Sequence, residues 1–227
     1  MMQAEWQSVI PALNKLEVTA NSDNDPVSID GESEGLLLIG TGTDAAVFRS
    51  ELFPHLAFKV YAQEKIEKKS IEEHVYDHLG SSPYFSRKIG SGENFLVLSF
   101  EEGTTLFDCL LRGIFIPSSV INEVEEARSH IRNCGLNPRD MHLKNILLQH
   151  GKVKIIDVSE YILPGNDQRW EYLKKGYQQY YRYINGKPVP SWLMETVRTW
   201  FNQTKGPDFT FEEFMKKVMA FTFRWKI

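Results

Sequence analysis

Two short segments that lie far apart in the chain carry side chains that could act together on a phosphate group. The segment 137–148 contains Asp140 and, five residues later, Asn145, which apolar residues follow. The segment 154–157 reads as a buried strand that ends in Asp157. Mg²⁺ prefers oxygen ligands and binds through one or two carboxylates together with phosphate oxygens. The pattern therefore predicts two carboxylates and an amide around a metal-bound phosphate.

A glycine-rich run upstream could bring backbone close to the same phosphate. It lies between two predicted strands, which favours a hairpin folded over phosphates rather than a strand-to-helix turn. Glycine matters here because it lets the backbone approach oxygen atoms closely. An ordinary hairpin turn would also explain this run. Its candidate ligand contacts are Gly40, Thr41, Gly42, Thr43 and Ala45.

A strand lysine and a helix glutamate form a candidate ion pair. Strand alternation places Ala57 and Lys59 on one face, where the small alanine leaves room for a flat base. The residues 65–79 have helical periodicity, and Glu72 lies on their apolar face. A buried carboxylate costs several kcal/mol, as a rough estimate, unless it is paired. We therefore expect Lys59 to pair with Glu72 and to bridge phosphate oxygens, with Glu73 as the alternative partner.

The elements that must position these side chains are a small sheet and a set of helices. Three β-like runs separated by turns predict an antiparallel meander, and a fourth apolar run predicts another buried strand. The Glu-Glu-Gly sequence at 101–103 ends that strand and predicts a hinge. A later helix can end at Gly135, directly before the Asp140 loop. The four predicted strands cover 36–39, 46–49, 56–61 and 95–100.

The first thirty residues predict an extension rather than part of the sheet. Apolar residues recur at helical spacing from Trp6 to Leu16, which predicts an amphipathic helix kinked at Pro11. The residues 21–26 are polar turn formers without periodicity, which is typical of a linker. Regular structure is expected to resume near Gly35.

Composition narrows the class of protein. The chain has 227 residues and 42% hydrophobic content, so it can bury a core of one domain or two small lobes. Its net charge of -4 argues against nonspecific binding to nucleic acid or to anionic membranes. Cys109 and Cys134 are too far apart for a Cys-x-x-Cys site, and no early apolar run indicates a signal peptide or a membrane span. A cytoplasmic location is the expectation.

From Leu36 to about Ser159, the order of these motifs resembles the protein-kinase-like superfamily. It is similar to the small, divergent serine/threonine-protein kinase-like proteins of bacteria. The resemblance implies an α+β fold of two lobes, in which a small antiparallel-sheet N-lobe precedes a reduced helical C-lobe. The implied boundaries are 1–30 for a helical extension and linker, 31–102 for the N-lobe and 103–227 for the C-lobe.

The same resemblance implies roles for individual residues, with ATP and Mg²⁺ as cofactors and a hydroxyl-bearing acceptor, expected to be a protein serine or threonine. Asp140 would orient the hydroxyl and accept its proton, while Asn145 and Asp157 would hold the metal. Lys144 would set a positive charge beside the transferring phosphate. The implied nucleotide contacts are the backbone of Ser99 and Glu101 and, on the two faces of the base, Val47 and Leu147.

The chain departs from the family pattern at several positions, and these departures leave alternatives open. Pro138 replaces the usual histidine, Ala45 the third glycine, and Ser159 the glycine that follows the metal-binding aspartate. His142 stands where serine/threonine kinases usually have lysine and where small-molecule kinases of the aminoglycoside or choline type often have histidine. A small-molecule phosphotransferase, a nucleotide-binding pseudokinase and a pure interaction protein therefore remain alternatives to a protein kinase.

Overall fold

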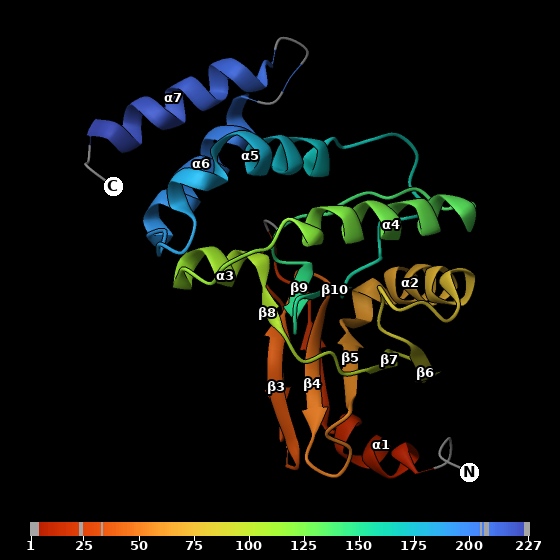
Figure 1. The fold of residues 1–227 in the computed structure, drawn as a ribbon. Helices are drawn as coiled ribbons and strands as arrows, with labels where there is room; N and C mark the ends of the chain where they lie inside the picture. The colour runs from red at the N-terminus through yellow and green to blue at the C-terminus, as the bar shows by residue number, and fades with distance from the viewer. Residues whose placement is uncertain (1–4, 23–24, 33, 205, 207–208, 225–227) are drawn as a thin grey trace.

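The computed structural model describes residues 5–22, 25–32, 34–204, 206 and 209–224. Within these ranges the chain forms a mixed α/β fold with three antiparallel sheets and seven α-helices. Figure 1 shows a five-stranded sheet, helix α2 and the N-terminal segment at one end of the molecule, which we call the sheet end. Helices α3–α7 lie at the opposite end, which we call the helical end.

The five-stranded sheet contains the predicted meander. Its strand order is β3-β4-β5-β7-β6, and all neighbours are antiparallel. The turn between β3 and β4 is tight, because the Gly42 N–H donates to the Ala45 carbonyl at 2.8 Å. The strands are β3 (Leu36–Thr41), β4 (Ala45–Ser50), β5 (Leu56–Tyr61), β6 (Lys88–Ser91) and β7 (Phe95–Ser99).

One face of this sheet packs against α2 (Ile66–Leu79), which follows the short 3₁₀ helix η3 (Gln63–Lys65). Paired residues of adjacent strands share a face, so Val47, Lys59 and Leu96 point the same way. Leu96 and Tyr61 belong to the hydrophobic cluster that also takes in α2 and the helical end. The face that carries Lys59 is therefore turned toward the helical end.

The N-terminal segment covers the opposite face of the sheet, and its structure differs from the prediction. Only short helices form, η1 (Trp6–Val9) and α1 (Ile10–Leu13). The segment predicted as a linker, 21–26, connects the strands β1 (Leu16–Thr19) and β2 (Ser28–Gly31) of a two-stranded antiparallel ladder, and its residues 23–24 lie outside the described residues. Ladder hydrogen bonds and burial of apolar side chains such as Val18 and Val27 against the sheet stabilise this hairpin. The domain boundaries themselves stay a prediction.

A second, three-stranded sheet connects the two ends of the molecule. It consists of β8 (Thr104–Thr105), β9 (Ile146–Gln149) and β10 (Lys152–Ile155) in the order β10-β9-β8. Helices α3 (Leu106–Arg112) and α4 (Ser119–Asn133) pack around it. Gly135 follows α4 with φ of +73°, in the left-handed region that ends a helix. The Asp140 loop therefore starts from the end of α4 and continues into β9.

The C-terminal helices are α5 (Arg169–Ile184), α6 (Ser191–Thr204) and α7 (Phe211–Arg224). Figure 1 shows them stacked beyond α3 and α4, away from the five-stranded sheet. The buried side chain of Trp170 fixes the start of α5, and its Nε1 donates to Glu125 of α4 at 2.9 Å. The packing of α5 on α4 thus decides which side chains of its first turn face the Asp140 loop.

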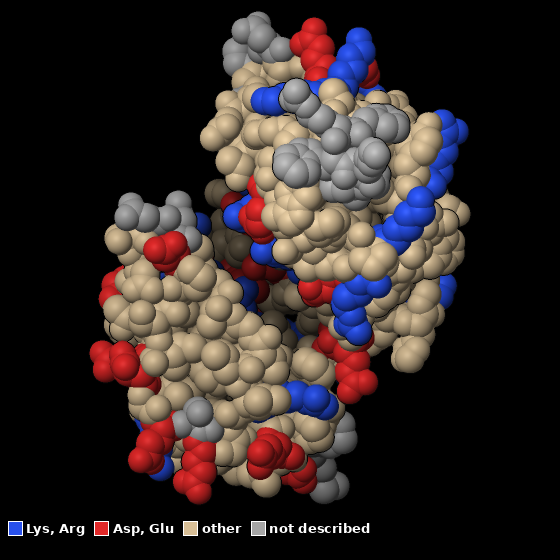
Figure 2. Space-filling view, turned by 90° about the vertical axis from the view of Figure 1, so that its left-hand side faces the viewer, with Lys and Arg blue, Asp and Glu red and all other residues tan. Residues whose placement is uncertain are grey.

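The surface is hollowed between the two ends. Figure 2 shows this hollow with acidic and basic side chains together inside it. None of the helices in the described ranges combines the length and the apolar character that crossing a membrane requires.

The contact between the N-terminal segment and the sheet can be tested at Gly90. A Cβ built on Gly90 of β6 would overlap the indole ring of Trp6, which is buried against Phe95. We expect Gly90→Ala to lower the free energy of unfolding by about 1–3 kcal/mol, the usual cost of overpacking. Urea unfolding followed by tryptophan fluorescence measures this change. In the control Gly176→Ala of α5 the new Cβ makes only an ordinary contact with the Phe211 ring, so equal losses in both variants would contradict the expectation.

Candidate active site

The buried ion pair between Lys59 and Glu72 is the best-defined contact of the site. The Lys59 Nζ lies 2.8 Å from Glu72 Oε1 and 2.6 Å from Oε2, and the Tyr61 hydroxyl donates to Oε2 at 2.7 Å. The Glu72 side chain is 0% exposed. Strand β5 supplies the lysine and the tyrosine, and helix α2 supplies the carboxylate. The structure therefore contains the ion pair between Lys59 and Glu72 that the sequence predicts.

Glu73, the alternative partner, has a different environment. Its carboxylate lies 2.6 Å from Lys69 on the preceding turn of α2 and 3.3 Å from Lys88 of β6. Burial opposes the charged form, but hydrogen bonds from Lys69, Ser91 and Lys88 lower the pKa of Glu73 to about 2. Glu73 therefore joins α2 to the edge of the sheet and leaves Lys59 to Glu72.

Lys59 also reaches the helical end of the molecule. Its Nζ lies 3.7 Å from Asp157 Oδ2, directly beyond β10. Burial opposes the ammonium, but the carboxylates of Asp157 and Glu72 outweigh it and raise the pKa of Lys59. Burial likewise opposes ionisation of Asp157, but Lys59 and the Ser159 N–H, which donates to Oδ1 at 3.1 Å, hold the pKa of Asp157 below its usual range. Both groups are therefore charged at neutral pH.

The loop that carries Asp140 has an unusual backbone. Asp140 has φ of +51°, a left-handed conformation that few non-glycine residues adopt. Three hydrogen bonds hold it: the Asp140 N–H donates to Asp167 Oδ2 at 2.9 Å, and the His142 N–H and Asn145 Nδ2 donate to the Asp140 carbonyl at 3.0 and 3.3 Å. The Asn145 Nδ2 also lies 3.4 Å from Asp140 Oδ2. The structure thus brings Asp140 and Asn145 together.

The segment with Asp157 is tied to the same loop. The Ile156 N–H donates to the Asn145 carbonyl at 3.1 Å, beside the ladder between β9 and β10. The backbone of Ile156 thus connects the segment with Asp157, which contacts Lys59, to Asn145, which contacts Asp140.

Arg169 and Asp167 are site residues that the sequence reasoning missed. Arg169, the first residue of α5, forms an ion pair with Asp140 Oδ1, and its Nε lies 3.6 Å from Asp167 Oδ2. Burial raises the pKa of Asp140 to about 7, with Arg169 opposing and the carboxylates of Glu160, Asp157 and Asp167 adding to the shift. An acid and an arginine two residues apart carry no periodicity or motif that would link them to a loop so far away in sequence.

Lys144 and His142 lie differently with respect to Asp140. The Lys144 Nζ lies 4.8 Å from the centre of the Phe107 ring of α3, in a cation–π contact. The His142 Nε2 is 3.7 Å from Asp140 Oδ2. Burial and the charge of Arg169 lower the pKa of His142, which favours the neutral ring at pH 7. The cation that touches the Asp140 carboxylate is Arg169.

The glycine-rich turn is a tight hairpin rather than a wide loop. Gly40 and Thr41 pair with Val47 and Ala46 across β3 and β4. The Val27 N–H donates to the Gly42 carbonyl at 2.8 Å, so the N-terminal segment supports the turn. A Cβ added to Gly40 would meet no described atom within 4 Å. The turn as a whole contains the predicted contacts Gly40, Thr41, Gly42, Thr43 and Ala45.

The predicted base contacts lie on β4, β5 and β9. Val47 is paired with Lys59, and Ala57, two residues before Lys59, is buried on the same face of the sheet. Leu147 is buried in β9. At the predicted hinge, the Ser99 N–H donates to the Arg87 carbonyl at 2.8 Å and is thus already bonded.

The two hinge side chains also have partners. The Ser99 hydroxyl donates to Glu101 Oε1 at 2.6 Å, and Glu101 Oε2 lies 3.3 Å from the Lys154 Nζ of β10. The hinge is thereby joined to the small sheet.

Three carboxylates gather at the Asp140 loop. Oxygen atoms of Asp140, Glu160 and Asp167 all lie within 4.8 Å of one another, and no other group of three potential metal ligands occurs in the described part of the chain. Two arginines balance this charge. Arg169 contacts Asp140 and Asp167, and the Arg139 Nε lies 3.6 Å from Glu160.

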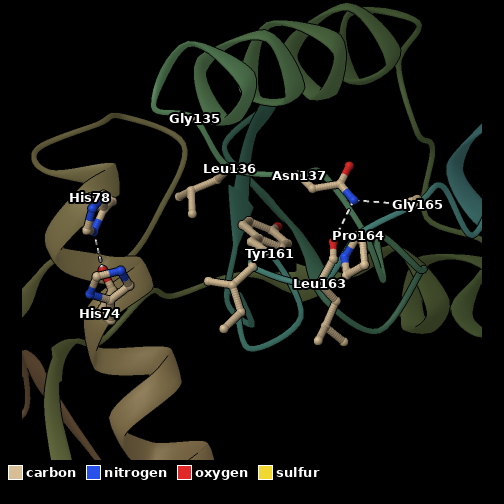
Figure 3. A pocket seen from close by; sticks show the side chains of 10 residues that line it. His74, His78, Gly135, Leu136, Asn137, Tyr161, Leu163, Pro164 and Gly165 are labelled. Atoms are coloured by element: carbon tan, nitrogen blue, oxygen red, sulfur yellow. Dashed lines mark hydrogen bonds between the residues drawn. The ribbon is translucent and has the colours of Figure 1, made fainter.

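A cavity of about 550 Å³ lies behind the Asp140 loop and contains none of the predicted site residues. Figure 3 shows it between the His74 and His78 side chains of α2 and the segments 135–137 and 161–165. The Asn137 side chain donates to the carbonyls of Leu163 and Gly165, which fastens the second segment to the loop. The His74 and His78 rings, whose centroids are 4.0 Å apart, lie in this lining, but the cavity contains neither Lys59 nor any of the carboxylates of the Asp140 loop.

Comparison with known proteins decides the family. Over 180 residues, the chain is 33% identical to a Bacillus subtilis (strain 168) protein named "Putative serine/threonine-protein kinase YrzF", and the match covers 76% of this chain and 84% of that protein. The chain belongs to the kinase-like family of YrzF. Other relatives of this kinase-like chain match a shorter region. "Testis-specific serine/threonine-protein kinase 3" of Mus musculus and that of Homo sapiens are each 34% identical over 70 residues, which is 29% of this chain and 26% of theirs.

No protein-family model matches the chain. Family membership therefore rests on the YrzF match, and the site geometry stands beside it as an independent observation.

The buried ion pair makes a direct prediction about stability. In Glu72→Gln the Lys59 ammonium loses its closest charge partner inside the protein, so we expect the free energy of unfolding to fall by about 3 kcal/mol, as for other broken buried pairs. Denaturant unfolding at neutral pH measures the change. The matched control is Glu67→Gln, an exposed glutamate of the same helix, where a surface charge contributes about 1 kcal/mol or less. A larger loss in the control than in Glu72→Gln would show that Glu72 does not carry the pair.

Proposed function

We propose that this kinase-like chain transfers the γ-phosphoryl group of ATP to a hydroxyl, with Mg²⁺, and that its acceptor is serine or threonine of a protein. The observation that carries the proposal is the ion-paired Lys59 of the sheet, 3.7 Å from Asp157. Ile156, the residue before Asp157, is hydrogen-bonded to Asn145, which in turn contacts Asp140. Kinases need this combination of a phosphate-binding cation, two metal-binding groups and an acceptor aspartate. The names of the relatives support the same reaction class.

The proposed nucleotide site uses the Lys59 face of the sheet. Lys59 is held by Glu72, so its ammonium is fixed where it can contact phosphate oxygens. The hollow between the sheet end and the helical end (Figure 2) is where we place the phosphates, with the two ends acting as the two lobes of a kinase. Because the Ser99 N–H is bonded to Arg87, adenine would be met at the hinge by the Glu101 backbone and the carbonyl side of Ser99.

The glycine-rich turn is proposed to cover the phosphates. No described atom fills the space beside Gly40, so packing within the protein does not explain a glycine there. Close approach of a ligand does explain it, because a side chain would occupy the volume that phosphate oxygens need. The support from Val27 gives the turn a fixed position over the hollow.

Asn145 and Asp157 fit a magnesium site by their chemistry. The Asn145 Nδ2 donates to Asp140, which leaves the amide oxygen as a potential ligand. Asp157 is held ionised by Lys59 and Ser159. The bound ion would neutralise charge on the phosphate oxygens. Asp140 would orient the acceptor hydroxyl and take its proton, a contribution of about 10²- to 10⁴-fold in rate.

A small-molecule acceptor is the second candidate. His142 lies 3.7 Å from Asp140, at the position where choline-type kinases often have histidine. Only the residues 158–168 separate Asp157 from the start of α5, so little chain is available to build a peptide-docking segment. Labelled phosphate that appears on metabolites and never on protein would favour this candidate.

The proposed reaction predicts a separation of binding from transfer. We expect Asp140→Asn to abolish transfer of labelled phosphate from ATP while nucleotide binding persists, because the amide cannot accept the hydroxyl proton. Lys59→Met should weaken both, since it removes the phosphate-binding cation. The assay is labelled ATP with Mg²⁺ and generic protein and small-molecule acceptors, and nucleotide affinity is followed by thermal shift.

The control for this assay is Asp77→Asn, an exposed aspartate of α2 that pairs with Lys88. It should transfer phosphate as the wild type does. Normal turnover in Asp140→Asn would overturn the assignment of Asp140. Nucleotide-dependent stabilisation of the wild type without any transfer would indicate a pseudokinase, and no nucleotide effect at all would indicate an interaction protein.

A further inference from the structure

We propose that Arg169 is a catalytic residue that contacts the transferring phosphoryl group, in place of the loop lysine predicted from the sequence. The inference rests on the proposed function and names one more participant at that site. It comes from the ion pair between the first residue of α5 and the Asp140 carboxylate.

The two oxygens of Asp140 have different neighbours. Arg169 holds Oδ1, while Oδ2 lies 3.4 Å from the Asn145 amide and 3.7 Å from the His142 ring. Oδ2 therefore faces the loop that bears the proposed metal ligand. An acceptor hydroxyl bound to Oδ2 would lie between Asp140 and the γ-phosphorus of ATP. The guanidinium of Arg169, on the other oxygen of the same carboxylate, would then be within reach of the phosphoryl oxygens.

Arg169 is held in place by a rigid support. The Trp170 ring is 2% exposed and hydrogen-bonded to Glu125, which fixes the first turn of α5 on α4. The Asp167 carboxylate accepts the backbone N–H of both Asp140 and Arg169, at 2.9 and 3.2 Å. One acid thus fixes the positions of the Asp140 loop and of Arg169 relative to each other.

The location of Arg169 is electrostatically unfavourable for the helix alone. Helix N-termini favour negative charge, and a cation in the first turn works against the helix dipole. Helix formation therefore gives no reason for an arginine at this position. Asp140 and Asp167 offset the cost, and a phosphoryl group that gains negative charge would use the same cation.

The other cations near the site are committed elsewhere. Lys59 is held by Glu72, Lys144 lies on the Phe107 ring, and Arg139 pairs with Glu160. Arg169 is thus the cation at the acceptor side of the site within the described chain.

The guanidinium has donors left for a substrate. Arginine offers five N–H groups in a planar fork, which matches two oxygens of a phosphoryl group. The side-chain contacts of Arg169 in the described chain involve Nη1 and Nε, and the side chain is 36% exposed. The Nη2 group can therefore turn to a phosphoryl oxygen without breaking the contact with Asp140.

In the transfer step, a bond forms between the acceptor oxygen and the γ-phosphorus, and the bond from phosphorus to the β–γ bridging oxygen breaks. The bridging oxygen leaves with the electron pair as part of ADP, and the hydroxyl proton moves to Asp140 Oδ2. Negative charge spreads over the equatorial oxygens during this step. A fixed donor directed at such charge contributes about 10²- to 10³-fold in kcat.

The experiment compares three variants in the labelled-ATP assay. We expect Arg169→Gln to lower kcat by about 10²- to 10³-fold with a small change in the KM for ATP. Arg169→Lys should retain part of kcat, because it keeps the charge but loses the fork. Free guanidinium ion at non-denaturing concentration should restore activity to Arg169→Ala. The control Arg182→Gln removes an exposed arginine from the same helix and should leave kcat unchanged.

Three results would overturn the inference. A wild-type kcat in Arg169→Gln would exclude a role in transfer and leave the proposed function intact. Equal losses of kcat in Arg169→Gln and Arg169→Lys, no rescue of Arg169→Ala by guanidinium, and lower melting temperatures of these variants would indicate that Arg169 is only a structural counter-ion of Asp140. If the wild-type protein transfers no phosphate, and Lys59→Met and Arg169→Gln bind nucleotide with the same affinity as each other, both the proposed function and the role of Arg169 in it are wrong.

Discussion

The structure depends first on a charge that is expensive to bury. The Glu72 carboxylate has no access to water and is stabilised by Lys59 and the Tyr61 hydroxyl. Such a pair stabilises little beyond what its desolvation costs, but neither member can be left alone inside the protein. The contact therefore fixes α2 against β5, and with it the direction of the lysine. An ammonium held in this way can meet Asp157 at the helical end.

The Asp140 loop is organised by a different constraint, a strained backbone. A left-handed aspartate costs about 1 kcal/mol or more unless its surroundings hold it. Here the Asp167 carboxylate and the Asn145 amide bind the backbone groups on either side of the residue. Because Asp167 lies two residues before the start of α5 and accepts the Arg169 N–H, the conformation of the loop depends on how that helix packs on α4. The conformation of the loop is thus coupled to the packing of α5.

The acidic character of the site explains why cations converge on it. Asp140, Asp157, Glu160 and Asp167 lie near one another, and the burial of Asp140 raises its pKa to about 7. Lys59 enters from the sheet and Arg169 from α5, so the cations reach the site from opposite ends of the molecule. A phosphate with its metal ion would lie between two such supports, as we propose for ATP.

The sequence alone determined the features that follow from local periodicity and from the cost of burying charge. The antiparallel meander, the pairing of Lys59 with Glu72, and the proximity of Asp140 to Asn145 are of this kind. The tertiary structure decided the β1–β2 hairpin, because cross-strand hydrogen bonds and the burial of Val27 against a distant sheet leave no local pattern. It also decided the contact of Lys144 with the Phe107 ring and the ion pair of Arg169 with Asp140. These two contacts depend on how α3 and α5 pack rather than on spacing along the chain.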